Sequence, residues 1–539
     1  MITVDGCNCC AKILAAYYPL SANGKQPPVY VDLDVRIGNM VSSCSLPIKE
    51  FNAKGIEKKC PLIRFQGKQA RPNFDNALVD ELTNGLADGS IQSGYYLEKS
   101  GAIVFPDGHI GFLRGAELLG ICNRPYKVAP EISDMELAGE GSILTHLLSL
   151  LITSPLQVLL VFAYVILSSI RSLLVSNGID LQAVLYIVGG QGLGKTTLAT
   201  RIAGIYKKDG RTAGIVQAGS THAAVNTLMT TLRDQPLVVD DLCLSASRDT
   251  TRKRIELVSK LLRQATGSIP IIKKSGTTTV ELPSEASLIL TAEYSLENMS
   301  DLTRCITVPI QYPIDIPDEL TTDLIGDAVR HYSLWFTEHI QDELKQFRRA
   351  VDIAVSKSDT DARIATNYAC LMTAFQSFIR SLTDLEYPQE MVAHAHNMMD
   401  MAISKAKERH SAMIEQIKDS IPVGNLSLCI LEGYRHDAFD LTKNVKKLCE
   451  HDGIIWKSDL CIKPEALIQF IRQQPGYHDW SSNRITRELK DIKALVLQEE
   501  NAATVRLSKE PGVSRVYRIR KEILKETARK YEGGVFNGM

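Results

Sequence analysis

The feature that most restricts the fold of this chain is the stretch from Ala183 to Thr200, which reads AVLYIVGGQGLGKTTLAT. An apolar run ends at two glycines, and Lys-Thr-Thr then opens a helical pattern. Glycines let successive backbone N–H groups turn toward a polyphosphate, and the helix N-terminus adds partial positive charge. This is the spacing of a P-loop, in which Lys195 reaches the β- and γ-phosphates and Thr196 ligates Mg²⁺. We therefore predict ATP binding, against the alternative of an ordinary Gly-rich turn, by Gly189, Gly190, Gln191, Gly192, Leu193, Gly194, Lys195, Thr196 and Thr197.

Two carboxylates follow an apolar run further along the chain. Residues Pro236–Leu242 read PLVVDDL, so we expect a buried strand to deliver Asp240 and Asp241 at its end. We predict that Asp240 holds Mg²⁺ together with Thr196, and that Asp241 orients or deprotonates the water that attacks the γ-phosphate. Most motor ATPases have Glu at the second place, so the shorter Asp241 predicts a closer water or slower turnover. The alternative is an Asp-Asp pair that caps a helix.

Two more residues complete the predicted hydrolysis site. The run Ser287–Glu293 (SLILTAE) reads as a strand, and Thr291 near its end is our candidate for contact with the γ-phosphate; capping of the next turn is the alternative. Arg304 stands just before the last expected strand of the region. In ring ATPases an Arg here stabilises transition-state charge in the neighbouring subunit's site, so this assignment predicts a closed ring. Surface solvation of Arg304 is the alternative.

The alternation of strand-like and helical runs around these motifs predicts the fold class. From Ile143 to about Pro309 the pattern implies a parallel sheet covered on both faces. We predict an α/β P-loop NTPase core, AAA+-like, with a five-stranded parallel sheet. The expected strands are Ala183–Val188, Thr212–Gln217, Leu237–Val239, Ser287–Leu290 and Cys305–Val308, and the expected helices are Thr196–Tyr206, Ala223–Leu232, Arg252–Gln264 and Leu296–Leu302.

The chain of 539 residues has room for about three or four domains. We predict an N-terminal α+β domain over residues 1–140, the ATPase core over 141–312, a helical lid over 313–424 and a winged-helix-like domain over 425–539. In the first we expect strands at Val29–Leu33, Leu62–Phe65 and Ala102–Val104, a helix at Asn76–Gly85 and a linker at Ala129–Gly141. In the lid we expect helices at Asp327–Val351 and Ala365–Leu382.

The last part of the chain has the pattern of two helices followed by a hairpin. Helices are expected at Pro464–Gln473 and Ser482–Leu495, with a turn at Pro475–Gly476 between them. Strand-like runs then follow at Val496–Gln498, Thr504–Leu507 and Arg515–Ile519, with a turn at Pro511–Gly512. This order is typical of a winged helix.

Basic residues suggest where an anionic partner binds. From Cys461 to Lys530 there are 15 Lys+Arg against 9 Asp+Glu, although the whole chain has a formal net charge of −1. The segment Ile269–Leu282 predicts a β-hairpin with a basic tip, which in a ring would point into the central channel. We predict DNA contacts from Lys273, Lys274, Arg484, Arg487, Lys490 and Arg518. A solvated hairpin turn, and protein rather than DNA contact by the winged helix, are the alternatives.

One apolar segment raises the question of a membrane. Residues Ile143–Ile170 carry no Asp, Glu, Lys or Arg and are long enough to span a bilayer. Pro155 divides the segment, serines dilute it, and its flanks are not strongly basic. We therefore expect a helix buried against the nucleotide-binding sheet and no membrane contact, and a membrane-tethered ATPase is the alternative.

The twelve cysteines and the N-terminus favour a reduced, cytoplasmic protein. Cys7, Cys9 and Cys10 form a C-x-C-C cluster that suits the start of a zinc site. No His lies near the cluster in sequence, and Cys44 and Cys60 are isolated, so incidental thiols are the preferred interpretation.

Taken together, the motifs resemble those of a known family. The order GGQGLGKTT, PLVVDD, a basic hairpin, LTAE and a late Arg, from about Leu46 (LPIKEF) to Pro309, resembles an ATPase family of bacterial mobile elements. That family, a domain of unknown function, includes helicase-like proteins of phages and of staphylococcal cassette chromosomes. The C-terminal pattern is similar to that of the cassette helicases, which are AAA+ proteins related to the MCM replicative helicases. The P-loop and the Asp pair are generic to P-loop NTPases, and Asp241 departs from the usual Asp-Glu.

This resemblance implies a homo-hexameric ATPase that threads or melts DNA during replication of a mobile element. The leading hypothesis is therefore an ATP-dependent DNA helicase or replication initiator. The second is a regulatory switch, in which nucleotide controls assembly and the winged helix binds DNA or protein without unwinding. Asp241 is the feature that keeps the second hypothesis open.

Overall fold

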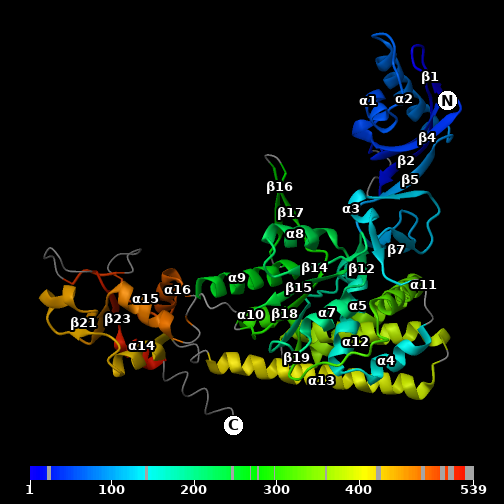
Figure 1. The fold of residues 1–539 in the computed structure, drawn as a ribbon. Helices are drawn as coiled ribbons and strands as arrows, with labels where there is room; N and C mark the ends of the chain where they lie inside the picture. The colour runs from blue at the N-terminus through cyan, green and yellow to red at the C-terminus, as the bar shows by residue number, and fades with distance from the viewer. Residues whose placement is uncertain are drawn as a thin grey trace. The chain divides into compact units, whose positions relative to one another are not determined.

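The computed structural model describes residues 1–20, 26–139, 144–243, 248–267, 269–275, 278–296, 298–358, 361–385, 387–420, 426–474, 477, 480–497, 504–507 and 515–527 (Figure 1). Contacts divide the chain into two compact units. The first comprises Met1–Ser295 with Thr303–Arg409, and the second comprises Leu296–Leu302 with His410–Met539. The division into four domains stays a prediction.

The centre of the first unit is a five-stranded sheet in which every neighbouring pair is parallel. Its order is β14-β15-β18-β11-β19, which confirms the predicted five-stranded parallel sheet. The strands are β11 (Val184–Gly189), β14 (Ile215–Gln217), β15 (Pro236–Leu242), β18 (Ser287–Ala292) and β19 (Cys305–Ile310). Consecutive strands of the chain are not always neighbours, because helices α7 (Lys195–Ala203), α8 (His222–Thr231) and α9 (Arg248–Ala265) carry the crossovers.

Three predicted boundaries of this core are wrong. The single strand expected at Thr212–Gln217 is split at Gly214, whose φ of +75° turns the chain. Before that turn, β13 (Arg211–Thr212) pairs with β12 (Tyr206–Lys208) in a separate sheet, so only β14 joins the core. Since Tyr206 belongs to β12, α7 also ends earlier than expected. The helix expected at Leu296–Leu302 is only α10 (Met299–Leu302).

The apolar segment before the core is buried inside the protein. It forms α4 (Leu147–Thr153) and α5 (Leu156–Ser169), and α5 packs against α7, β15 and β19. Twelve of the fourteen residues of α5 are buried. Its Tyr164 hydroxyl donates to the carbonyl oxygens of Ala183 and Leu288, which ties the helix to two strands. The expected buried helix is confirmed, and among the described residues no helix has the length and hydropathy of a membrane span.

Three long helices follow the core, in the region predicted to be helical. They are α11 (Thr322–Ser356), α12 (Ala362–Ser381) and α13 (Gln389–Ser420). Helix α12 packs against both α5 and α11, so α5 is covered on the side away from the sheet by helices that come later in the chain. This explains why α5 carries so few polar residues.

The N-terminal part of the first unit is built on a mixed sheet of order β4-β3-β2-β5-β9, with β1 paired to β2. The strands are β1 (Ile2–Thr3), β2 (Cys10–Pro19), β3 (Tyr30–Ile37), β4 (Met40–Pro47), β5 (Gln92–Leu97) and β9 (Tyr126–Val128), and the helices are α1 (Ala53–Lys59) and α2 (Ala70–Ala87). Apolar residues of the sheet, such as Val31 and Leu33, pack against Ile56 of α1 and Phe74 of α2. The expected α+β character of this part is confirmed.

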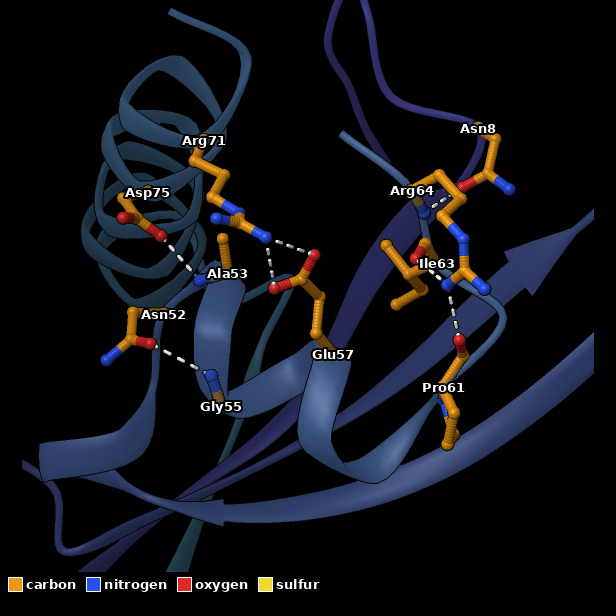
Figure 2. A network of polar contacts seen from close by, with 10 residues as sticks. All are labelled: Asn8, Asn52, Ala53, Gly55, Glu57, Pro61, Ile63, Arg64, Arg71 and Asp75. Carbon is orange, nitrogen blue, oxygen red and sulfur yellow. Dashed lines mark hydrogen bonds and ion pairs between the residues drawn. The ribbon is translucent and has the colours of Figure 1, made fainter. Parts of the chain in front are cut away.

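Polar contacts fix α1 against α2, as Figure 2 shows. Asn52 caps α1 by accepting from the amide of Gly55 at 2.9 Å, and Asp75 of α2 accepts from the amide of Ala53 at 2.5 Å. The carboxylate of Glu57 accepts from Arg71 at 2.8 and 2.9 Å. Asp75 is therefore a capping residue that joins two helices.

The strand expected at Leu62–Phe65 is wrong. Asn8 takes up most of its backbone groups. The Asn8 side chain donates to the carbonyl of Leu62 and accepts from the amide of Arg64, the second of which Figure 2 shows, and the Asn8 amide donates to the carbonyl of Arg64. Phe65 makes only an isolated bridge, to Cys7. A side chain that satisfies both backbone groups removes the need for a ladder.

The segment expected to be a linker is part of the fold. Between Ala129 and Gly139 the chain forms α3 (Pro130–Ser133) and β10 (Met135–Leu137), and β10 pairs with β12. Residues 140–141 lie outside the described ranges. A second small sheet of order β6-β7-β8, formed by Gly101–Val104, Ile110–Arg114 and Glu117–Leu119, precedes it.

A buried polar cluster joins this small sheet to the core. The guanidinium of Arg114, which is fully buried, donates to the Asp234 and Ser169 carbonyls and to the Ser333 hydroxyl. The Asp234 carboxylate accepts from the amides of Ala102 and Ser172. Because Asp234 lies two residues before β15, this cluster anchors the start of the strand that carries the Asp pair.

The second unit contains a four-stranded sheet of order β20-β21-β22-β23, with helices packed on it. Its elements are α14 (Leu426–Arg435), β20 (Leu441–Thr442), β21 (Gly453–Trp456), β22 (Asp459–Ile462), α15 (Pro464–Gln473), α16 (Ser482–Asp491) and β23 (Tyr517–Ile519). The helices α15 and α16 were expected, whereas the β21–β22 hairpin was not. Isolated bridges join Leu495 to Ile519 and Val505 to Val516. The expected turns at Pro475–Gly476 and Pro511–Gly512, and Gln498, lie outside the described residues. The winged-helix assignment stays a prediction.

Candidate nucleotide-binding site

The Gly-rich loop joins the carboxyl end of β11 to the first turn of α7, as the motif predicts. Gly192 and Gly194 have φ of +76° and +87°, a region that residues with a Cβ rarely occupy. Gly194 is the N-cap of α7. The loop therefore needs glycine at both positions, and it exposes amides at the helix N-terminus, where a phosphate is stabilised.

Lys195 is the first residue of α7 and is largely buried. Its ammonium donates to the carbonyl oxygen of Gly190 at 2.7 Å. The contact holds the charge above the loop, beside the space that the amides surround. A phosphate that enters this space competes with one backbone carbonyl for the lysine.

Asp240 is buried beneath the loop and is held by hydroxyl groups from two directions. Thr196 donates to its two carboxylate oxygens at 2.9 and 3.1 Å, and Thr291 donates to Oδ1 at 2.6 Å. Gln217, at the end of β14, donates to Oδ2 at 3.4 Å. The structure thus brings together three residues predicted from separate motifs, and it adds Gln217, which the sequence analysis missed.

A β-bulge places the two acids differently. Val239 pairs with Leu290 and Leu242 pairs with Ala292, so Asp240 and Asp241 together stand opposite Thr291. Asp241 has φ of +66°, and its amide donates to the Thr291 hydroxyl at 3.0 Å. The bulge turns Asp241 out to an exposed position while Asp240 stays buried.

These groups line one pocket of about 320 Å³ at the carboxyl ends of the strands. This is the edge at which open α/β sheets bind ligands. Its lining residues are Gln191, Gly192, Gly194, Lys195, Thr196, Thr197, Asp241, Leu242, Thr291, Ala292 and Glu293. Glu293 was not among the predicted site residues, although it ends the same SLILTAE run.

The chemistry of this donor set fits Mg²⁺. A Thr hydroxyl and an Asp carboxylate are the oxygen ligands that Mg²⁺ prefers, and here Thr196 and Asp240 already touch each other. Lys195 lies at the adjacent end of the loop. The residues present therefore suit a magnesium–triphosphate complex in both charge and ligand type.

Arg304 is buried in this structure. It directly precedes β19, and its carbonyl accepts from the amide of Val184. Its side chain is only 7% exposed, so surface solvation is wrong. A contact with a neighbouring subunit, which stays a prediction, requires the side chain to turn outward.

The predicted basic hairpin is present. It consists of β16 (Ile271–Ser275) and β17 (Thr278–Leu282), and it stands out from the core in Figure 1. Lys273 and Lys274 pair with Val280 and Thr279, so both lysines belong to a strand and precede the tip. Their side chains, and residues 276 and 277 of the expected tip, lie outside what the structure describes.

In the second unit, α16 exposes two of the predicted basic residues. Arg484 and Arg487 are exposed and lie one turn apart, while Lys490 is half-buried. The guanidinium of Arg484 lies 4.2 Å from the centre of the Trp480 ring. Arg518 donates to Asp459 at 2.7 Å, so this predicted DNA contact already neutralises a carboxylate.

The N-terminal cysteines lie close together. Cys7 and Cys9 have their sulfur atoms 3.1 Å apart, and burial raises the pKa of the Cys9 thiol. Burial likewise raises the pKa of Cys44 to about 12. Within the described ranges, no three His, Cys, Asp or Glu side chains group as metal ligands.

Comparison with solved structures finds a similar fold over nearly the whole chain. SCCmec type IV Cch, described as an active helicase, superposes with a TM-score of 0.59 at 14% sequence identity, over 96% of this chain and 94% of that one. In fold, the chain is similar to Cch over nearly its whole length. JCV helicase with a bound inhibitor matches at a TM-score of only 0.22 and 14% identity, over 46% of this chain and 65% of that one. No family model and no curated protein matches the chain.

The likeness to Cch agrees with the sequence resemblance to the helicase-like proteins of staphylococcal cassette chromosomes. At 14% identity it concerns the arrangement of strands and helices. The chemistry of this chain must therefore be argued from its own side chains.

Proposed function

We propose that this chain is an ATP-dependent DNA helicase or replication-initiation ATPase of a mobile genetic element or phage, with an AAA+-like core and a C-terminal winged helix. The observation that carries the proposal is the contact of Thr196 and Thr291 with the buried Asp240 beneath the Gly-rich loop. A chain that only bound phosphate would need the loop, but it would not need a buried carboxylate held at the metal position. The arrangement supports hydrolysis.

In this proposal the pocket residues have separate tasks. The loop amides and Lys195 bind the β- and γ-phosphates, and Thr196 with Asp240 holds Mg²⁺, which neutralises phosphate charge. Thr291 keeps the carboxylate of Asp240 aimed at the metal position through its 2.6 Å hydrogen bond, and for its proposed contact with the γ-phosphate the hydroxyl would have to leave Asp240 and turn to the phosphate. Asp241 stays a candidate for orienting the attacking water.

DNA is the proposed substrate on which ATP hydrolysis acts. The hairpin with Lys273 and Lys274 supplies backbone contacts that do not depend on sequence. The exposed Arg484 and Arg487 of α16 form the proposed duplex contact, and the Trp480 ring beside Arg484 holds that cation in place. Lys490 and Arg518 are weaker candidates because the first is half-buried and the second is paired with Asp459.

The test of the proposal is ATP hydrolysis by the full chain with and without single-stranded DNA. We expect DNA to stimulate hydrolysis, Lys195→Ala to abolish nucleotide binding, and Lys208→Ala, a half-buried control position on β12, to leave both unchanged. Hydrolysis that is indifferent to DNA counts against a helicase. Strand separation of a forked duplex then tests unwinding itself.

A homo-hexameric ring is the proposed assembly, and Arg304 is its proposed trans-acting residue. We expect the mass in solution to rise to a hexamer with ATP and single-stranded DNA. Mixing Arg304→Ala subunits with Lys195→Ala subunits should restore part of the hydrolysis, because one of the two orders of a mixed interface pairs the intact loop of the first variant with the intact Arg304 of the second. A monomer at all nucleotide concentrations removes the ring and this role of Arg304 together.

A nucleotide-controlled regulatory switch is the second candidate. It is favoured by the left-handed backbone of Asp241, which holds a short acid where a longer one is usual. It predicts slow hydrolysis, nucleotide retained through purification, and sequence-specific DNA binding without strand separation. Quantifying the nucleotide that co-purifies with the chain separates the two candidates.

A further inference from the structure

The nucleotide pocket contains a carboxylate that none of the sequence motifs assigns. Glu293 follows β18 and lines the pocket together with Asp241 and Thr291. It is exposed, whereas Thr291, two residues earlier, is fully buried. The residues that line the pocket therefore include two exposed acids, Asp241 and Glu293.

The end of the β15–β18 pairing places Glu293 at the pocket. The Thr291 hydroxyl faces Asp240, and Glu293 is the residue that directly follows β18. The amide of Glu293 donates to the Leu242 carbonyl at 3.0 Å, which holds its backbone beside the end of β15. Glu293 thereby lines the same pocket as Asp241 and Thr291.

Neither Thr291 nor Asp241 is well suited to activate the water that attacks the γ-phosphate. Thr291 already donates to Asp240 and accepts from the amide of Asp241, so its hydroxyl is committed to positioning the two acids. Asp241 sits on the bulge, and its left-handed backbone is one that residues with a Cβ rarely adopt. Its reach is one methylene shorter than that of a glutamate.

We propose that Glu293 is a catalytic residue that orients the attacking water and takes its proton, a role that rests on the proposed ATP hydrolysis. The water oxygen forms a bond to the γ-phosphorus as the bond from that phosphorus to the β-phosphate oxygen breaks. One water proton passes to the Glu293 carboxylate and then to solvent, and the leaving group is ADP. Asp241, on the opposite strand, limits the position of the same water from the other side.

The test compares Glu293→Gln with Asp241→Asn in the full chain, with Glu338→Gln, at an exposed position of α11, as the control. Both pocket variants keep the size of the side chain and remove its basicity. Binding of a fluorescent ATP analogue and single-turnover hydrolysis are measured for each. We expect E293Q to bind the analogue as the unaltered chain does and to hydrolyse about 100-fold or more slowly, the effect of losing a general base. We expect D241N to lose less than tenfold and E338Q to be unchanged.

The relative loss of hydrolysis in the two pocket variants decides between the two acids. E293Q that retains hydrolysis within about threefold while D241N loses it overturns the inference and assigns the base to Asp241. Failure of the proposed function is distinct, because the unaltered chain itself would then neither bind nor hydrolyse ATP.

Discussion

The hydroxyl of Thr291 donates to Asp240 at 2.6 Å and accepts from the amide of Asp241 at 3.0 Å. One side chain at the end of β18 thereby sets the positions of both acids at the end of β15. The contact depends on the bulge, since only there do two residues of β15 share one partner on β18. The position of the acid at the proposed metal site is therefore tied to the position of its neighbour through a single threonine.

Replacing Thr291 by Val should slow hydrolysis about 10- to 100-fold and leave nucleotide affinity nearly unchanged. Valine keeps the shape but removes a hydrogen bond to a charged group, which is worth about 1.5–3 kcal/mol. Steady-state kinetics with separate binding measurements check this, and Thr291→Ser, which keeps the hydroxyl, should retain most of the rate. An equally slow serine variant would show that the methyl group, rather than the hydroxyl, matters.

Thr196→Ala should raise the Mg²⁺ concentration needed for half-maximal hydrolysis by about tenfold, because it removes the hydroxyl that lies at the proposed metal position. The matched control is Thr200→Ala on the same helix, whose hydroxyl bonds to the Thr197 carbonyl. Magnesium titrations of both variants make the comparison. The same magnesium requirement in both variants would remove Thr196 from the metal site.

Asp234→Asn should lower the free energy of unfolding by about 1–3 kcal/mol, since an amide then presents donors to the buried donors of Ala102 and Ser172. The control is Asp209→Asn. Asp209 also has a positive φ but is exposed in the turn after β12, so this change should have little effect. Denaturant unfolding followed by fluorescence reports both. If the two variants unfold alike, the buried cluster does not stabilise the first unit.

The stability of the second unit should fall in acid because of His410, whose burial lowers its pKa from the ordinary 6.5 to about 4. Below pH 6.5 the unfolded chain binds a proton that the folded chain does not accept until about pH 4, so folding is penalised increasingly across that window. The full penalty is about 3 kcal/mol. Urea midpoints at several pH values should therefore fall less steeply for His410→Gln than for the unaltered chain. His339→Gln, at an exposed histidine of α11, should keep the original slope.

The amino-acid sequence alone was sufficient for the parts of the molecule that depend on local order along the chain. The Gly-rich loop, the strand that ends in Asp240 and Asp241, and the helices α15 and α16 are each specified by residues close together in sequence. Hydrophobic runs of the right length also predicted the five parallel strands and the buried helix α5. These features follow from backbone geometry and from the burial of apolar side chains, which a short window reveals.

Only the tertiary structure decided the features that depend on distant partners. Asn8 binds backbone groups of the segment Leu62–Phe65, which was expected to be a strand. The segment expected to be a linker contains β10, which pairs with β12. The bulge at Asp241 arises from the register of β15 against β18, and that register brings Glu293 into the pocket. Strand pairing joins residues about fifty positions apart. The sequence of neither strand alone therefore shows that two residues of β15 stand opposite Thr291. The P-loop could be identified from its sequence, whereas the identity of the group that faces the water required the fold.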